Sequence, residues 1–326
     1  MIQDAPGVSL AAVVDPNPVA LQSAGETPGY GSLEEALAGV ECDAVVVSSP
    51  PETHHAVAKS ALEAGKHVLC EKPLSTSLSD ALDLMETARR ANRIMMVSQN
   101  YRYNAPFRAV QRVISEGGIG DLISIEINFR RDTRNQFAPD DFRYSMRHPL
   151  VLDMAIHHFD LLRAVTGRDV RHIHACGWRA PDSHFAHHTE VAAVMALEDE
   201  LPVMYRGTWT ARGPETSWNG DWEIVGKEGR LFWTGDLEDR NVGEVVIERW
   251  NEPPRILDQP SLQFTERAAT LQALRVAIET GGEPETAASD NVKSLAAVLG
   301  CVRSIEDSET ADVVELLAAA RRGAGV

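Results

Sequence analysis

The 326-residue chain is long for a single hydrophobic core, which predicts two domains. Its 31 Lys and Arg against 48 Asp and Glu give a net charge of −17, which disfavours nucleic acid and anionic membrane surfaces as partners. Four scattered cysteines without a C-x-x-C pair, no membrane-length apolar run and no charged-then-apolar leader predict a cytoplasmic protein.

The first third of the chain alternates apolar strands with helices. Strands are predicted at residues 8–14, 44–48, 65–70 and 94–98, and helices at 33–37, 53–64 and from Ser77 or Ser79 to residue 91. Thr53 is the expected N-cap of the second helix, and Gly65 follows its end. Alternating units of this length are typical of right-handed parallel crossovers, so residues 1–100 are predicted to form a doubly wound parallel sheet.

The strand at 65–70 ends abruptly at Glu71, Lys72 and Pro73. An open parallel sheet binds its ligands beyond the carboxyl ends of its strands, so Lys72 is expected to face a ligand there. Pro73 biases Lys72 away from the helical region and holds the ammonium at the strand end; a cis bond between them is an option open to any X-Pro pair. A solvated lysine in a strand-to-helix turn is the alternative that this stretch alone leaves open.

From residue 101 onwards the pattern becomes that of a mostly antiparallel sheet with short connections. A helix is predicted at 106–115 and strands at 122–129, 170–178, 191–197, 203–209, 222–225, 230–233 and 244–250. Helices at 261–279, 291–307 and 312–322 complete a second domain predicted for residues 101–326. Four tryptophans in or beside the strands fit an interface, a substrate wall or ordinary core: Trp209, Trp218, Trp222 and Trp233.

Residues 149–167 predict an apolar helix with one polar stripe, formed by Asp153, His157 and Asp160 at spacings of four and three. Carboxylates favour the charged form of a half-buried histidine and poise it for general-base catalysis near neutral pH. A hydrogen-bonded structural histidine is one alternative. A divalent metal held by this pair with His184, His187 and His188 is a weaker one, because loop histidines lack fixed spacing, and no metal is predicted.

Three stretches together resemble the Gfo/Idh/MocA family of nicotinamide-dependent sugar and polyol oxidoreductases. They are residues 65–68 running into Glu71-Lys72-Pro73, residues 152–161, and residues 48–54. Weaker similarities at residues 15–16, 99–102 and 222–229 spread the likeness over nearly the whole chain. The resemblance implies an α/β fold, with a truncated Rossmann domain followed by an α/β domain whose large, mostly antiparallel sheet commonly forms the subunit interface of a homodimer or homotetramer.

The resemblance also implies a catalytic trio of Lys72, Asp153 and His157. His157 would take the proton of a sugar or polyol hydroxyl as the hydride leaves for the nicotinamide, Lys72 would stabilise the alkoxide, and Asp153 would orient the imidazole or bind a neighbouring hydroxyl. Cofactor contacts are implied at Asp15, Ser48, Ser49, Pro50, His54, Glu71, Lys72 and Gln99. Substrate contacts are implied at Lys72, Asn100, Arg102, Asp153 and His157. Asp15, as a ribose-binding acid, would favour NAD over NADP.

Five arginines are expected near the mouth of the crevice, where they indicate either an acidic or phosphorylated sugar or simply solvated surface: Arg102, Arg130, Arg131, Arg134 and Arg143.

The chain has no G-x-G-x-x-G fingerprint for a dinucleotide pyrophosphate. If Asp15 binds the ribose, these glycines are expected before Met1, and this chain is expected to bind NAD less tightly than a version extended upstream by about 30 residues. Two rival functions stay open. One is a non-catalytic sensor of sugars or protein partners with the same fold, and the other is an enzyme that uses tightly held NAD for sugar elimination or hydrolysis.

Overall fold

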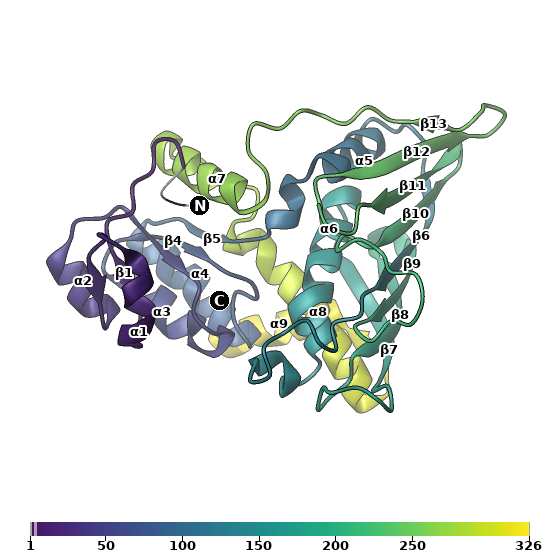
Figure 1. Ribbon diagram of the computed structural model, residues 1–326. Helices are drawn as coiled ribbons and strands as arrows, with labels where there is room; N and C mark the ends of the chain where they lie inside the picture. The colour runs from purple at the N-terminus through teal and green to yellow at the C-terminus, as the bar shows by residue number, and fades with distance from the viewer. Residues whose placement is uncertain (1, 3–4, 326) are drawn as a thin grey trace. The chain divides into compact units, whose positions relative to one another are not determined.

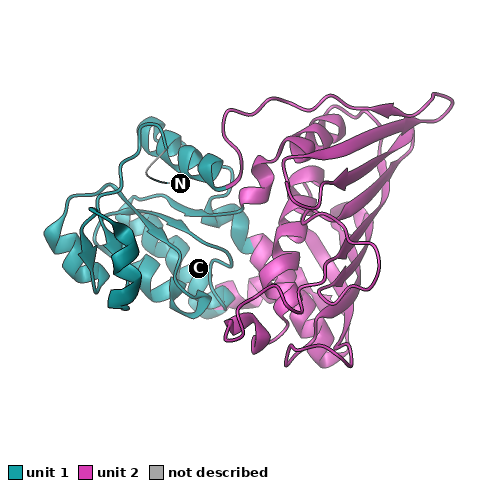
Figure 2. Ribbon diagram, in the orientation of Figure 1, with its two compact units in different colours: residues 1–99, 267–292, 323–326 teal, residues 100–266, 293–322 magenta. Residues whose placement is uncertain are grey.

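The computed structural model describes residues 2 and 5–325 of the protein, which divide into two compact units (Figures 1 and 2). Unit 1 takes residues 1–99, 267–292 and 323–326, and unit 2 takes residues 100–266 and 293–322. Residues 267–292, expected in the second domain, thus belong to the first. Their attachment is visible at Thr286, whose carbonyl accepts from the Val97 N–H (2.9 Å) and whose hydroxyl donates to the Val97 carbonyl (2.7 Å).

Unit 1 holds the alternating strands and helices of the first third of the chain. Its elements are β1 (Val13–Val14), α1 (Pro18–Leu21), η1 (Gln22–Ala24), β2 (Gly29–Tyr30), α2 (Leu33–Gly39), β3 (Ala44–Val47), α3 (Pro51–Glu63), β4 (His67–Cys70), α4 (Leu78–Ala91), β5 (Met95–Val97) and most of α7 (Glu266–Thr280). The described strands of this unit all pair in parallel, which confirms the predicted Rossmann-type arrangement.

The parallel strands form two sheets rather than one, β1–β2 and β3–β4–β5. The strand expected at 8–14 is real only at Val13 and Val14, because only these two residues pair with the short β2. Val14 and Val46 keep 39% and 37% of their surface exposed, unlike the buried Val68 at the centre of β4.

Local side-chain chemistry decides where the helices of unit 1 begin. Ser77 is the N-cap of α4, since its hydroxyl accepts from the Asp80 N–H (3.2 Å). The prediction that Thr53 is the N-cap of α3 is wrong, because the N-cap is Pro50. The helix begins two residues earlier at Pro51, whose fixed φ suits a first turn, and the Thr53 hydroxyl donates to the Pro50 carbonyl.

Unit 2 is built on one large sheet. Its elements are η2 (Asn100–Tyr103), α5 (Ala105–Ser115), β6 (Leu122–Arg130), η3 (Phe142–Tyr144), η4 (Leu150–Ala155), α6 (Ile156–Thr166), β7 (Val170–Trp178), β8 (Glu190–Leu197), η5 (Glu198–Glu200), β9 (Pro202–Thr208), β10 (Asp221–Gly226), β11 (Gly229–Gly235), β12 (Gly243–Arg249), β13 (Arg255–Ile256), most of α8 (Ala288–Asp307), β14 (Ala311–Asp312) and most of α9 (Val313–Ala324). The strand order is β13-β12-β11-β10-β6-β9-β8-β7-β14. The β6–β9 pair is parallel and the other pairs are antiparallel, which confirms the expected mostly antiparallel sheet.

Helices α5, α6 and α8 pack on one face of this sheet (Figure 1). Phe107 of α5 contacts Trp233 of β11, and Phe159 of α6 meets Tyr205 of β9 edge-on with ring centroids 5.2 Å apart. Of the four tryptophans considered above, Trp209, Trp222 and Trp233 are core residues, while Trp218 is half-buried.

No described helix covers the opposite face of the sheet, on which Val194 of β8 and Met204 of β9 lie side by side, 58% and 43% exposed (Figure 1). Separately, among residues 2 and 5–325, no helix is both long and apolar enough to cross a membrane.

Candidate active site

The carboxyl ends of the parallel strands in unit 1 carry the residues implied as cofactor contacts. Asp15 follows β1, Ser48 to Pro50 follow β3, Glu71 and Lys72 follow β4, and Gln99 follows β5. Ser48 and Pro50 are exposed, and Asp15 and Lys72 are half-buried. The Lys72–Pro73 peptide bond is cis. All these residues therefore lie at the carboxyl ends of parallel strands, which is where open parallel sheets bind their ligands.

His54 does not line this edge in the way the resemblance implies. Its ring is 1% exposed, with Nδ1 2.8 Å from the Pro73 carbonyl and Nε2 2.8 Å from the Ser49 carbonyl. Both ring nitrogens are occupied by backbone oxygens, because α3 points the ring back at the two turns that flank it. His54 therefore links the turn after β4 to the loop after β3 through its two hydrogen bonds.

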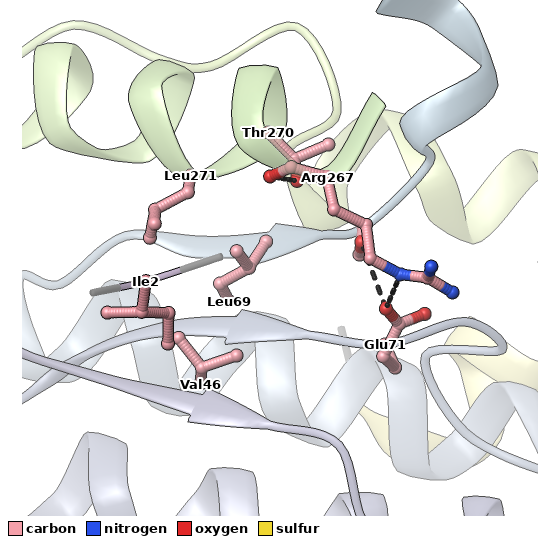
Figure 3. A pocket seen from close by; sticks show the side chains of 8 residues that line it. Ile2, Val46, Leu69, Glu71, Arg267, Thr270 and Leu271 are labelled. Atoms are coloured by element: carbon pink, nitrogen blue, oxygen red, sulfur yellow. Dashed lines mark hydrogen bonds and ion pairs between the residues drawn. The ribbon is translucent and has the colours of Figure 1, made fainter. Parts of the chain in front are cut away.

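Glu71 lies at the end of a small, mainly apolar cavity under α7 (Figure 3). Its carboxylate accepts from Arg267 Nε (3.1 Å) and from the Ser98 hydroxyl (3.4 Å). The cavity measures about 20 Å³, close to the volume that one water molecule needs, so it does not hold a substrate. Its other lining residues are Ile2, Val46, Leu69, Thr270 and Leu271.

Gln99 provides a test of whether this edge fits a dinucleotide. The side chain is 1% exposed, yet within the described part of the chain neither its Nε2 nor its Oε1 has a hydrogen-bond partner. Buried amides normally have partners, and a ligand hydroxyl or carboxamide supplies both a donor and an acceptor. The buried amide of Gln99 therefore fits a polar group of a nicotinamide cofactor.

His157 is the candidate base of unit 2. It lies in the first turn of α6, is 5% exposed, and stacks on Tyr101 of η2 with ring centroids 4.0 Å apart and planes within 8°. The neighbouring His158 is different, since its Nδ1 lies 3.0 Å from the Tyr205 hydroxyl and its Nε2 lies 3.0 Å from the Trp218 carbonyl. Burial lowers the pKa of His158 to about 4, so this ring is neutral and structural.

Asp153 is half-buried and paired with an arginine. Arg143 Nε donates to its carboxylate (2.8 Å) and Arg143 Nη1 reaches Asp141 (3.1 Å), so the guanidinium is shared by two acids. Burial opposes the charge of Arg143, but these two carboxylates raise its pKa overall. The Arg143 guanidinium also lies over Phe142, 4.6 Å from the ring centroid. Asp153 thus keeps its negative charge balanced within η4, the π-helix that precedes α6.

Asp160 does not share the surroundings of Asp153 and His157, with which the sequence predicts it to form one polar stripe. Its buried carboxylate forms a two-point ion pair with Arg102 (2.6 and 2.7 Å) and accepts from the Ser294 hydroxyl (2.7 Å). Residues 150–155 form a π-helix instead of an α-helix, so the expected 3.6-residue spacing does not hold across the segment. Arg102 is 4% exposed and bonded in this way, so it is a structural residue here and not an open substrate contact. Asn100, in the same short helix, is also buried.

The other arginines expected at the crevice mouth all have acidic partners. The pairs are Arg130 with Asp221, Arg131 with Glu215, Arg134 with Asp132 and Asp182, and Arg143 with Asp141 and Asp153. No group of three His, Cys, Asp or Glu suited to a metal ion occurs among the described residues.

Two partners in these sites escape sequence reasoning. Tyr101 lies inside the stretch 99–102 that resembles the family, but nothing in its spacing indicates a contact with His157. Arg143 is 10 residues from Asp153, in a segment without periodic structure, so only its charge suggests a carboxylate partner.

Comparisons with known proteins agree with these two units. Residues 1–99 match the family described as "Oxidoreductase family, NAD-binding Rossmann fold", and residues 107–232 match "GFO/IDH/MocA C-terminal domain". The chain is 28% identical to a 1,5-anhydro-D-fructose reductase from Ensifer adhaerens, over 86% of this chain and 83% of that one. It is 25% identical to a D-apiose dehydrogenase from Paraburkholderia graminis, over 98% and 86%.

A solved structure shares the fold. An oxidoreductase from Agrobacterium radiobacter, in complex with NAD+, L-tartaric acid and magnesium, has a TM-score of 0.86, 22% identity, and coverage of 97% of this chain and 94% of its own.

Proposed function

We propose, since the chain belongs to the Gfo/Idh/MocA family of NAD(P)-dependent oxidoreductases, that it transfers a hydride between a nicotinamide cofactor and a carbinol or carbonyl carbon of a sugar, polyol or related cyclic alcohol. The observation that carries this proposal is the presence in one chain of a Glu-Lys-Pro turn at a parallel strand end and of a stacked histidine that follows a half-buried carboxylate by four residues. The two curated relatives, which are named for a reductase and a dehydrogenase of sugars, support the substrate class.

Residues at the strand ends of unit 1 would hold the cofactor: Asp15, Ser48, Ser49, Pro50, Glu71, Lys72 and Gln99. When bound, the cofactor would accept the hydride of the carbinol carbon in oxidation and return it in reduction. Gln99 would offer its buried amide to a polar group of the cofactor. Asp15 would accept from ribose hydroxyls and repel a 2′-phosphate, which favours NAD over NADP.

His157 would act as the general base of the oxidation. The hydroxyl proton of the substrate passes to the imidazole, which leaves an alkoxide oxygen whose electrons form the carbonyl. Lys72 would stabilise that developing negative charge with its ammonium. Asp153, held by Arg143, would bind a neighbouring substrate hydroxyl or orient the imidazole, and Asn100 would add a further polar substrate contact.

The helix-free face of the large sheet would form the contact between subunits of a homodimer or homotetramer. Apolar side chains such as Val194 and Met204 are exposed there, while Arg230 is flanked by Glu223 and Glu248 on neighbouring strands. An apolar patch edged by such ion pairs is typical of surfaces that bind a second protein.

The function is tested by assaying the purified chain with D-apiose and NAD+ or NADP+, and with 1,5-anhydro-D-fructose and NADH or NADPH, within a wider panel of sugars and cyclitols. We expect turnover of at least one member, and Lys72→Ala and His157→Gln should each lower its kcat about a hundredfold or more. Lys59→Ala and His174→Gln, which alter a surface ion pair and the outer sheet face, serve as controls. No turnover combined with sugar binding would instead favour the sensor, and unchanged kcat would exclude the substituted residue.

A further inference from the structure

The rings of Tyr101 and His157 lie closer together, and their planes are more nearly parallel, than in most aromatic contacts. Aromatic pairs prefer offset or edge-to-face arrangements with centroids about 4.5–7 Å apart, since two parallel π-faces repel each other. Here the centroids are 4.0 Å apart and the planes differ by 8°. The imidazolium form of histidine strengthens such a stack, because a cation over an aromatic face is attracted to it. The contact therefore favours His157 after it has gained a proton.

Tyr101 is itself fixed from another element. The Arg240 guanidinium lies 4.9 Å from the Tyr101 ring centroid, and Arg240 forms a two-point ion pair with Glu266 (2.9 Å for Nε to Oε1). The Arg240 carbonyl accepts from Asn219, whose own amide oxygen accepts from Asn104, one residue after η2. This chain of contacts ties the loop that carries Arg240 to the short helix that carries Tyr101.

The charges around the stack are balanced. Arg240, Glu266 and Asp153 act electrostatically on Tyr101, and burial is the largest reason that the pKa of its hydroxyl rises to about 12. Tyr101 is therefore a neutral ring at physiological pH. Glu266 offsets the Arg240 cation, which alone would oppose a protonated imidazole near it.

We propose that Tyr101 is a positioning residue for His157, whose ring it holds in one plane and whose imidazolium it stabilises when the substrate proton arrives. The catalytic part of this inference rests on the proposed role of His157 as base. Stabilisation that exists only in the protonated state acts on the transition state more than on the bound substrate, so it supports kcat rather than affinity.

The test is a histidine NMR titration of the full chain without substrate, with the His157 signal assigned from its loss in His157→Gln. In Tyr101→Leu we expect the His157 pKa to fall by about 0.5 to 1 unit, the size expected from a lost cation–π contact. Tyr101→Phe keeps the ring and should titrate like the wild type. Tyr103→Leu makes the same change two residues along the same helix and should leave the titration unchanged.

Turnover of the best panel substrate gives an independent readout. Tyr101→Leu should lower kcat about tenfold with little change in KM, and Tyr101→Phe should restore it. An unchanged His157 titration in a folded Tyr101→Leu variant would overturn the inference, as would a Tyr101→Phe variant as impaired as Tyr101→Leu. If His157→Gln keeps full activity while the titration shifts as expected, the base assignment fails and the stacking contact stands.

Discussion

At the scale of single residues, two adjacent histidines have different surroundings. His158 is enclosed between Tyr205 and the Trp218 carbonyl and stays neutral, whereas His157 lies on the ring of Tyr101. The difference comes from their positions on α6, which turns successive side chains about 100° apart. One faces the sheet, where Phe159 and Tyr205 also meet, and the other faces η2.

His158 makes a prediction for stability against pH. Burial lowers its pKa from 6.5 to about 4, so between these values the unfolded chain binds a proton that the folded chain does not. The free energy of unfolding should therefore decrease as the pH falls through this window, by about 1.4 kcal/mol per pH unit for this one proton. Urea unfolding at pH 7 and pH 4.5 should show a smaller decrease in His158→Gln than in the wild type, and an equal decrease would contradict the burial argument.

The resemblance to the Gfo/Idh/MocA family is what implies roles for Lys72, Asp153 and His157. In the structure Lys72 follows the end of β4, Asp153 lies within η4, and His157 lies in the first turn of α6. The sequence does not reveal that Arg102 and His54 are buried and bonded within the protein, because it shows their chemistry but not their surroundings. Which side chain a buried guanidinium or imidazole meets depends on elements far away in the chain, such as Asp160 for Arg102, 58 residues on.

At the scale of elements, a buried polar network joins three helices of unit 2. Asp160 of α6 binds Arg102 of η2 and Ser294 of α8, and Arg163, one turn further along α6, donates to the same Ser294 hydroxyl (2.7 Å). Removing one member of such a pair leaves a buried charge without compensation. The network therefore holds η2, which carries Tyr101, against α6, which carries His157.

Asp160→Asn should accordingly lower the free energy of unfolding of unit 2 by about 3–5 kcal/mol, and the double variant Arg102→Met/Asp160→Leu should lose much less. All six tryptophans lie between residues 178 and 250, so the tryptophan fluorescence of a urea titration reports on unit 2 alone. A double variant as unstable as the single one would show that the network's hydrogen bonds, and not its charge balance, hold the helices.

Elements with a clear period are the ones that the sequence predicts well. The strand at 170–178 has the predicted bounds, since alternation of buried and exposed side chains marks both of its ends. The apolar run at 8–14 gives a much shorter strand, because pairing needs a neighbour and the run itself carries no information about one. The π-helix at 150–155 shares its apolar pattern with an α-helix and cannot be distinguished from it by residue type.

At the scale of the whole molecule, the exposed sheet face predicts self-association. Light scattering at micromolar concentration should give at least twice the 35.6 kDa mass of one chain. Val194→Glu, on the exposed face, should shift the mass towards one chain, because a buried unpaired charge opposes the contact. Ile123→Glu serves as a control, because Ile123 is also exposed but lies near the start of β6, where the pairing with β10 is irregular. A monomeric wild-type protein would remove the proposed interface.

The central claim is that a substrate C–H hydride passes to the nicotinamide while His157 takes the hydroxyl proton. The most direct measurement uses the alcohol that the protein oxidises fastest, deuterated at its carbinol carbons. Mass spectrometry then gives the mass of the reduced cofactor. We predict one deuterium per reduced nicotinamide, formed about a hundredfold more slowly by His157→Gln. Reduced cofactor without deuterium, or undiminished transfer by His157→Gln, would contradict the account.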